Sequence, residues 1–589
     1  MKAINLLLIG LACLLSVSAV AQKLLPYSFQ HQADSSDHKT LRFLTQVTQP
    51  NTTFLRLYFT GTQLSEGSYL VLEGADGARQ ELRKQDLENW HYSSAYFNGQ
   101  SINVSLFAAP SDRNTVRISE VRVTDPQVGQ ARNAQRRAKT GGTTVQTTSA
   151  TSPDLTEYPY SKAVGRFTNG SDSYGTGWIA PNGAIVTSYK VAFQVNSEGY
   201  DVIEFNIPAS DGATVQHPTP QDQYPVKDWD KNGFKTFAFH GASATEVNSA
   251  GWAVLEALPN GTGLRPGERQ QEYFRVATNP SNYIIDAMGD VPVDLFHYGN
   301  DAYDLLQGKT TYRTLRLTQT ALLKQNSYLG LRDGVSTDRD VFVLYNMPFF
   351  LQSHEGAPVA YAGSNVAIGV HDDIPEDNPA YGLGFRDDGF RNGLASFFSN
   401  NSVYVDPEGL YDPGTGEIHK PFRTENKAAS DAPVGAQVYF ARGDYYGPST
   451  FNRPMTLRAP VGTVRMGVPF SSARKAAGPT ISPQLLAEGS SSSFVRESAE
   501  DRQVMASPNP FKEQTEINYP FAVGGPVSVH IFNMAGVPVA TFTPNDAASG
   551  QKGVQWNGTD RHGMPVPAGL YLVKVNFGNQ TYTTKVLKN

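Results

Sequence analysis

The sequence predicts a mostly β, multidomain protein. Glycine and proline are frequent, at 53 and 37 of 589 residues, and short segments of alternating apolar and polar residues recur along the chain. Alternation of this kind between turn-forming residues is typical of half-buried strands. Because one hydrophobic core rarely grows beyond roughly 250–300 residues, a chain of this length should form several domains.

Residues 1–21 have the physical character of a signal peptide. Lys2 precedes an apolar run from Leu6 to Val17, and Ala19-Val20-Ala21 offers small residues for cleavage before Gln22. No other stretch approaches the ~20 apolar residues that a membrane-spanning helix needs, so we expect no membrane span. The mature chain is therefore predicted to be exported and soluble.

The single cysteine, Cys13, lies inside this predicted signal peptide. A lipoprotein signal is the alternative, but Gly10 stands where such signals favour leucine. The mature chain then has no disulfide, no thiol nucleophile and no thiolate metal site. Its net charge of −6 is mild and no basic stripe stands out, so a nucleic-acid partner is not expected, nor is a cofactor.

Residues 22–125 predict an N-terminal β-sandwich. Residues 53–59 and 101–106 alternate well, and turn-forming residues 74–77 separate such segments. The run FLRLYFTGTQLSEGSYLVLEGADG resembles the CUB-like domains of some secreted bacterial proteases. A generic carbohydrate-binding or adhesive sandwich is the alternative, and with it adhesion as a function.

Two polar segments predict linkers. Residues 126–157 contain Arg132, Arg136, Arg137 and Lys139 ahead of a run of Gly, Thr and Ser, and residues 471–503 contain Ser490–Ser493. Cleavage in the first linker would release a propeptide, but an exposed linker is the commoner explanation.

Residues 158–406 form the largest block, and strand signals such as 340–345 dominate it, with one helix expected at 389–398. Residues 407–470 predict a small β unit. The segment GTGEIHKPFRTENKAASDAPVGAQVYFARGDYYG resembles one turn of a secreted parallel β-helix. Because one turn does not bury its own apolar face, it should pack on a neighbour.

Residues 504–589 carry a separate set of motifs: ASPNPF, VSVHIFNMAGVPV, VQWNGTDRHGMPVPAGLYLVKV and TTKVLKN. About seven short strands around Trp556 predict an Ig-like β-sandwich. The segment resembles the type A sorting domain of the type IX secretion system, through Pro508, Asn509, Pro510, Phe511, Trp556, Gly558, Gly563, Gly569, Tyr571 and Lys585. The resemblance implies the type IX machinery as partner and a secreted or outer-membrane-surface location reached through the periplasm. An Ig-like domain without an export role is the alternative.

Three landmarks in the central block resemble trypsin-like, glutamyl-endopeptidase-like serine proteases. They are GTGWIAPNGAIVTSYKVA, SAGWAVLEALPNGTGLRPGE and SHEGAPVAYAGSNVAIGVHDD, in the order that the family has them. The resemblance implies a central double β-barrel of trypsin-like type.

Each landmark differs from the family at the position of a catalytic residue. Lys190 stands at the position of the catalytic histidine, Gly251 at that of the aspartate, and Glu355 at that of the nucleophilic serine. Ser353 replaces the oxyanion-hole glycine, and His371 matches a histidine that contacts acidic substrate side chains in the glutamate-specific branch. Gly175 and Val191 stand at the positions of two half-cystines.

These departures remove the arrangement that acyl transfer needs, namely a hydroxyl, a base and an orienting carboxylate. We expect Lys190 and Glu355 to form an ion pair in its place. The sequence therefore favours an inactive protease homologue that binds an unidentified protein or peptide. The alternative is an active endopeptidase with a non-standard site, for which a shifted Ser353–His354 dyad is one arrangement.

Metal sites are not expected. His371 and His217 are candidate ligands, but no paired His-x-x-x-His spacing is present. Asp372-Asp373 and Asp387-Asp388 are candidates for calcium, for which solvated acidic loops are the favoured explanation.

Overall fold

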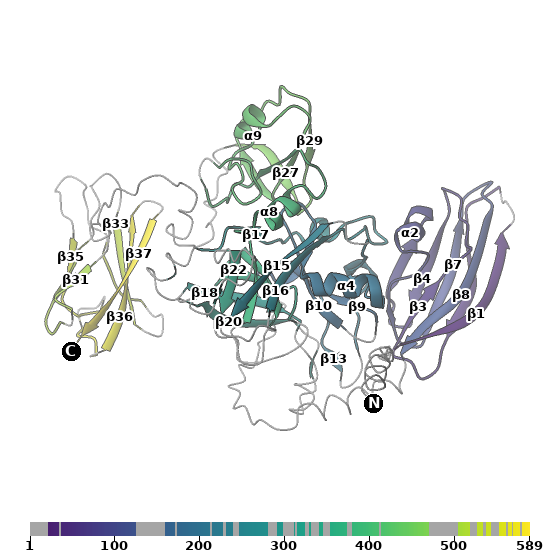
Figure 1. Cartoon of the computed structure of the whole chain (residues 1–589), viewed down its shortest axis with the longest axis horizontal. Coiled ribbons are helices and arrows are strands. Elements are labelled where there is room, and N and C mark those ends of the chain that lie inside the picture. Colours follow the sequence, from purple (N-terminus) through teal and green to yellow (C-terminus); the bar gives the residue numbers. More distant parts are fainter. Residues whose placement is uncertain are drawn as a thin grey trace, which may run out of the picture. The chain divides into compact units, whose positions relative to one another are not determined.

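The structure is a computed structural model, and it contains two compact units that divide near residue 488 (Figure 1). It describes residues 22–33, 37–124, 159–170, 173–211, 215–227, 231–239, 247–280, 285, 291–298, 311–312, 315–323, 329–330, 341–345, 354–373, 380–411, 414–469, 505–509, 511–518, 527–533, 538–542, 553–560, 564–567, 569–577 and 580–588. The predicted signal peptide and both predicted linkers lie outside these residues. The chain is mostly β, as the sequence predicts.

The N-terminal strands form two four-stranded sheets. One contains β1 (Gln22–Ala33), β8 (Asn114–Thr124), β3 (Phe54–Tyr58) and β6 (Phe97–Asn98), and the other contains β2 (Thr40–Thr48), β7 (Ser101–Ala108), β4 (Tyr69–Gly74) and β5 (Arg79–Leu82). Along β7 every second side chain is buried, which is the alternation that its sequence predicts. The short helix α2 (Lys84–Asn89) leads to the fully buried Trp90 of the shared core.

The next strands form a half-barrel, whose sheet runs in the order β14-β12-β9-β10-β11-β16-β15-β21. Its members are β9 (Val164–Thr168), β10 (Ser173–Ile179), β11 (Ile185–Thr187), β12 (Val202–Glu204), β14 (Gln223–Pro225), β15 (Lys231–Phe239), β16 (Val247–Leu255) and β21 (Leu329–Gly330). Between β11 and β12 lies the helix α4 (Tyr189–Glu198), which contacts β16. The sequence did not predict this helix. Two further short elements belong to this region: the 3₁₀ turn Pro220–Asp222, directly before β14, and α5 (Pro266–Gln270), after β16.

A second, closed barrel of six strands follows. It closes because β25 pairs with both β22 and β24. Its members are β18 (Val291–His297), β20 (Arg316–Leu322), β22 (Phe342–Tyr345), β23 (Pro358–Tyr361), β24 (Val366–Asp373) and β25 (Ala380–Gly384). Outside the ring, β17 (Arg275–Val276) pairs with β24, and β13 (Ser210–Asp211) pairs with β19 (Thr311–Tyr312).

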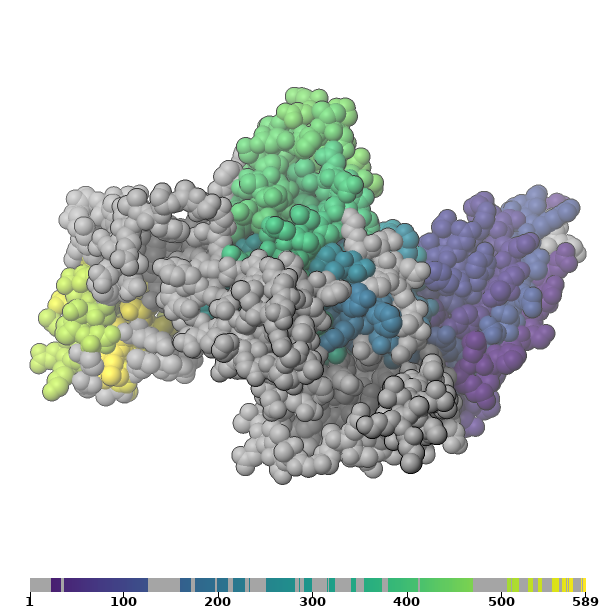
Figure 2. Space-filling view, viewed as in Figure 1, coloured from purple at the N-terminus to yellow at the C-terminus, as the bar shows by residue number. Residues whose placement is uncertain are grey.

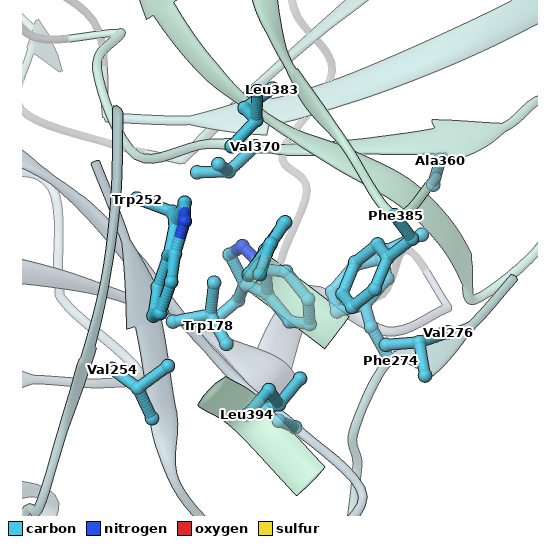
Figure 3. Packing of buried hydrophobic residues seen from close by; sticks show 14 of the residues in the cluster. Trp178, Trp252, Val254, Phe274, Val276, Ala360, Val370, Leu383, Phe385 and Leu394 are labelled. Atoms are coloured by element: carbon cyan, nitrogen blue, oxygen red, sulfur yellow. The ribbon is translucent and has the colours of Figure 1, made fainter. Parts of the chain in front are cut away.

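One apolar cluster joins the two barrels (Figure 3). Trp178 comes from β10 and Trp252 from β16, and both are buried. Trp252 stacks on Phe390 of α8 (Asp388–Ala395), with ring centroids 5.4 Å apart. A Cβ at Gly393 would lie 2.2 Å from Trp252 Cη2, so only glycine lets α8 approach this closely. The helix expected at 389–398 is thus present and covers the junction of the barrels.

The small β unit has parallel strands. Its sheets are β26-β27-β29 and β28-β30, formed by β26 (Ser402–Val405), β27 (Ala436–Phe440), β28 (Gly443–Tyr446), β29 (Met455–Arg458) and β30 (Val464–Val468), with α9 (Glu425–Asp431) beside them. It therefore has more than the single turn suggested by the sequence, and it begins at β26, before residue 407. It packs on a neighbour as expected, because Arg275 forms an ion pair of 2.7 Å with Asp406.

The C-terminal unit is a sandwich of two sheets, in the orders β31-β32-β35 and β34-β33-β36-β37. The strands are β31 (Met505–Ser507), β32 (Thr515–Asn518), β33 (Val527–Asn533), β34 (Pro538–Phe542), β35 (Gly553–Trp556), β36 (Gly569–Phe577) and β37 (Gln580–Lys588). Trp556 is the centre of the core, with Phe511 and Tyr571 each 5.2 Å away between ring centroids. In the described part of the chain, no helix is both long and apolar enough to cross a membrane.

Candidate functional site

The three protease-like landmarks meet where the barrels join. The Thr176 amide on β10 donates a 2.8 Å hydrogen bond to the Glu355 carbonyl, and Thr187 Oγ1 at the end of β11 donates one of 2.7 Å to the Thr176 carbonyl. The Gly356 amide donates a 2.8 Å bond to the His371 carbonyl of β24. The turn at residues 354–357 is therefore held between the two barrels, which positions Glu355 between them.

Two glycines make this close approach feasible. Gly356 has φ +87°, and a Cβ there would lie 2.0 Å from the Thr176 carbonyl oxygen. Gly175 has φ +76°, and its Cβ would lie 2.1 Å from Val191 Cγ2. Gly175 and Val191, the two positions that the sequence aligns with half-cystines, therefore face each other.

Lys190 lies in the first turn of α4. Ser188 caps this helix, since its Oγ accepts a hydrogen bond from the Val191 amide. The Lys190 side chain is 36% exposed, and its Nζ lies 3.6 Å from Asp372 Oδ2 on β24. The sequence led us to expect Glu355 as the counter-ion, and it did not suggest Asp372.

Gly251 lies on β16, two residues before Ala253, which pairs with Thr187. It therefore stands on the strand beside β11, close to the start of α4, and it brings no side chain to the site. Ser353 lies outside the described residues. Of the four predicted positions, the structure brings Lys190, Gly251 and Glu355 to the same junction.

Three buried histidines lie behind this junction. The sequence suggested His371 as a binding residue and His354 as part of a shifted dyad, but it did not suggest His297. The rings of His297 and His354 are 4.1 Å apart between centroids, and those of His354 and His371 are 6.2 Å apart. His371 Nδ1 lies 2.5 Å from Tyr345 Oη. Burial, followed by the fields of His354 and Lys190, holds the pKa of His371 well below its ordinary value.

A threonine hydroxyl also contacts an imidazole of this cluster. His297 Nε2 lies 2.9 Å from Thr318 Oγ1, within the range of a nucleophile–base hydrogen bond. The two residues come from the neighbouring strands β18 and β20 of the closed barrel, where such a cross-strand bond also serves packing. The sequence contains no signal for this pair beyond the presence of a histidine and a threonine, because their contact depends on the register between β18 and β20.

The second candidate metal ligand, His217, belongs to a different cluster. Its Nδ1 lies 2.6 Å from Glu204 Oε1, and Arg166 Nη2 lies 2.8 Å from Glu204 Oε2. All three side chains are buried. His217 is therefore part of a buried charge network, separate from His371. No group of side chains suited to a metal ion occurs among the residues that the structure describes.

The sequence predicts that the two acidic pairs lie in solvated loops. This prediction is wrong for Asp372 and for Asp387. Asp372 is buried on β24 and pairs with Lys190. Asp387 is buried and caps α8, accepting a 2.7 Å hydrogen bond from the Phe390 amide. Asp388 is exposed and forms an ion pair with Arg391.

The C-terminal motif residues have separate roles in their sandwich. Trp556, Phe511 and Tyr571 fill its core, whereas Pro508 and Asn509 are exposed. Asn509 Oδ1 accepts a 2.8 Å bond from the Leu587 amide, which ties the start of the domain to its last strand. Gly558 has φ +68° and Gly569 +156°. Lys585 is on β37, while Pro510, Gly563 and the Lys585 side chain lie outside what the structure describes.

Residues 515–580 match the family model of the FlgD Ig-like domain. Comparison with curated protein sequences gives no match. Among solved structures, the chain is similar to PorZ, a surface component of the type IX secretion system of Porphyromonas gingivalis, with 22% identity and a TM-score of 0.13 over 15% of this chain and 11% of that one. It is also similar to PorU of that organism, with 22% identity and a TM-score of 0.13 over 14% and 9%. The chain thus spans only a small part of either structure.

Trypsin-like serine proteases are also among its structural neighbours. The protease VesB of Vibrio cholerae is 8% identical, with a TM-score of 0.24 over 74% of this chain and 97% of that one. An inactivated protease paralogue of the scabies mite is 15% identical, with a TM-score of 0.24 over 40% and 92%. The strand pairings of the chain itself define the half-barrel and the closed barrel.

Proposed function

We propose that this chain is an exported, catalytically inactive homologue of trypsin-like serine proteases that binds proteins or peptides at the junction of its two barrels. One observation supports the proposal: Lys190, Gly251 and Glu355, which the sequence aligns with the catalytic histidine, aspartate and serine of the family, lie at this junction. An ammonium ion, a missing side chain and a carboxylate do not reproduce the hydroxyl nucleophile, imidazole base and orienting carboxylate that acyl transfer by this family uses. The pairing of Lys190 with Asp372 supports a structural replacement.

Turnover of quenched fluorescent casein tests this proposal. The proteins are the mature chain, residues 22–589, and its Glu355→Ala variant, with a set of glutamate-containing peptides as second substrate. We expect no cleavage by either protein, and retention of unfolded casein by the immobilised wild type. Cleavage that survives inhibitor-treated control preparations would overturn the inactive assignment.

The second candidate function is an active endopeptidase, and the contact between Thr318 and His297 is the observation that favours it. A Thr318→Val variant keeps the shape of the side chain and removes its hydroxyl. If the wild type cleaves casein and Thr318→Val does not, this pair is the catalytic centre and the binding role is wrong. Equal turnover by both proteins would direct the search for a nucleophile elsewhere.

We further propose that the C-terminal sandwich directs export by the type IX system, either into the medium or to the outer-membrane surface. The order and spacing of its motifs support this, together with its match to an Ig-like family over residues 515–580. Removing residues 505–589 should leave the protein in the periplasm of a type IX-competent host. Normal appearance of the truncated chain outside the cell would contradict the export role.

A further inference from the structure

We infer that the N-terminal sandwich is a permanent partner of the half-barrel, and that it stays bound when the chain is cut between residues 125 and 158. Such a cut would therefore give a two-piece protein and would release no propeptide. The inference is independent of the proposed function. It depends on four sets of contacts between the sandwich and the half-barrel, whose purple and blue atoms lie next to each other in Figure 2.

The first is an ion pair between a buried guanidinium and a carboxylate that is 30% exposed. Arg56 on β3 of the sandwich is 1% exposed, and its two terminal nitrogens lie 2.8 and 3.0 Å from the two carboxylate oxygens of Asp201, just before β12. The guanidinium also donates to Ser94 O and Ser93 Oγ. If the sandwich left, Asp201 would lose its bidentate partner, which is the strongest kind of charge-assisted hydrogen bond.

The second set consists of reciprocal amide bonds. Gln223 on β14 accepts a 2.8 Å bond from the Tyr96 amide and donates one of 2.8 Å to the Tyr96 carbonyl. Asn98 on β6 likewise accepts a 2.9 Å bond from the His217 amide and donates one of 2.9 Å to its carbonyl. Since Gln223 is buried, separation would break both of its bonds to Tyr96.

The third is aromatic packing. The His217 ring stacks on Tyr96 at 4.8 Å and meets the edge of Phe54 at 5.3 Å. A Cβ at Gly170 would lie 2.5 Å from the Tyr96 ring, so the backbone of the half-barrel touches this aromatic group directly. Val202 of β12 packs within the apolar core of the sandwich. Buried Tyr and Arg side chains of this kind dominate the energetics of stable interfaces.

The fourth is a contact between backbones. A Cβ at Gly261 would lie 2.7 Å from the Glu81 carbonyl oxygen, at the end of the sandwich where β5 lies. Nearby, Gln221 donates a 2.9 Å bond to the Arg79 carbonyl. The interface therefore extends from β6 to β5 and leaves no room for an added side chain at Gly261. Such close fit is a property of permanent rather than removable partners.

The experiment replaces residues 140–146 of the mature chain with the recognition sequence of a site-specific protease, and compares the cut protein with the uncut one by size-exclusion chromatography. At about 1 µM, pieces with a nanomolar Kd remain associated. We expect both pieces to elute together at the position of the uncut chain. Separation of folded pieces at this concentration would overturn the inference.

A matched pair of variants tests whether this interface holds the pieces. Gly261→Asn places a Cβ against Glu81 and should raise the Kd of the cut pieces at least tenfold. Gly263→Asn adds the same side chain two residues later, where a Cβ meets nothing within 4 Å and where asparagine tolerates the φ of +79°. It should behave as the wild type. Equal Kd values for the two variants would show that the pieces associate through another surface.

Discussion

At the scale of single residues, the contact between Lys190 and Asp372 makes a prediction about stability. Asp372 is buried, so Lys190→Ala deprives a buried carboxylate of a cation. We expect the free energy of unfolding to fall by about 1–3 kcal/mol, reduced from the value for a fully buried pair because Lys190 is partly exposed. Urea unfolding of the two proteins measures this difference.

The control for this measurement is Lys227→Ala. Lys227 Nζ lies 3.5 Å from Glu256 Oε2, and the lysine is 51% exposed. Removing an exposed pair should change stability by less than about 1 kcal/mol. Equal losses for both lysines would mean that Lys190 acts as an ordinary surface residue.

The buried histidines predict a dependence of stability on pH. The pKa of His371 lies well below its ordinary value of 6.5 in the folded chain, so the unfolded chain binds a proton more readily. The stability that neutral His371 contributes is complete above about pH 6.5 and is lost as the pH falls toward the folded pKa, by up to about 1.4 kcal/mol per pH unit. His354 and Tyr345 face His371, and His297 packs on the His354 ring. Lys190 forms an ion pair with Asp372, the residue next to His371.

Urea midpoints at several pH values, for the wild type and His371→Gln, separate this effect from that of other histidines. The glutamine has no charge to gain and keeps an acceptor for Tyr345. We expect its midpoint to fall less between pH 7 and pH 5 than that of the wild type. Parallel curves would show that protonation of His371 does not limit stability in acid.

The positions of the candidate site were predictable because each lies inside a short motif with fixed neighbours. Lys190 follows β11 and Ser188, the N-cap of α4. Glu355 precedes Gly356, the glycine that the turn requires. Asp372 and His297 were not predictable as members. Their places depend on how β24 and β18 align within a closed barrel, and register is set by pairings distant in sequence.

At the scale of elements, the turn between the barrels predicts a strict need for Gly356. Gly356→Ala should destabilise the chain by more than about 3 kcal/mol, because its Cβ would lie 2.0 Å from the Thr176 carbonyl in addition to the strain of φ +87°. Gly363→Ala is the control, since Gly363 has φ +71° but a Cβ there meets nothing within 4 Å. Thermal melting should show a small loss for Gly363→Ala, and comparable losses would contradict a packing role for Gly356.

Strands were easier to predict than the other elements. The segment 101–106 alternates, and β7 buries every second side chain. The helix α4 was missed because residues 189–193 mix aromatic and β-branched types, which favour strands in isolation, whereas the cap at Ser188 and contacts with β16 stabilise the helix. The extent of the parallel unit was missed because β26 joins it from a segment assigned to the preceding domain.

At the scale of the whole molecule, the division near residue 488 predicts two unfolding transitions in calorimetry. Trp556 is 1% exposed in the core of the C-terminal unit, and Trp178 is fully buried between the barrels. Trp556→Ala should cost the C-terminal unit about 3–5 kcal/mol and lower its Tm by at least ~10 °C, since small domains are the most sensitive. Trp178→Ala should lower only the Tm of the unit that contains the barrels.

Because the N-terminal sandwich shares its interface with the half-barrel, its residues should melt together with the barrels and give no third transition. A single transition moved by either variant, or a separate one assigned to residues 22–124, would contradict this division of the chain.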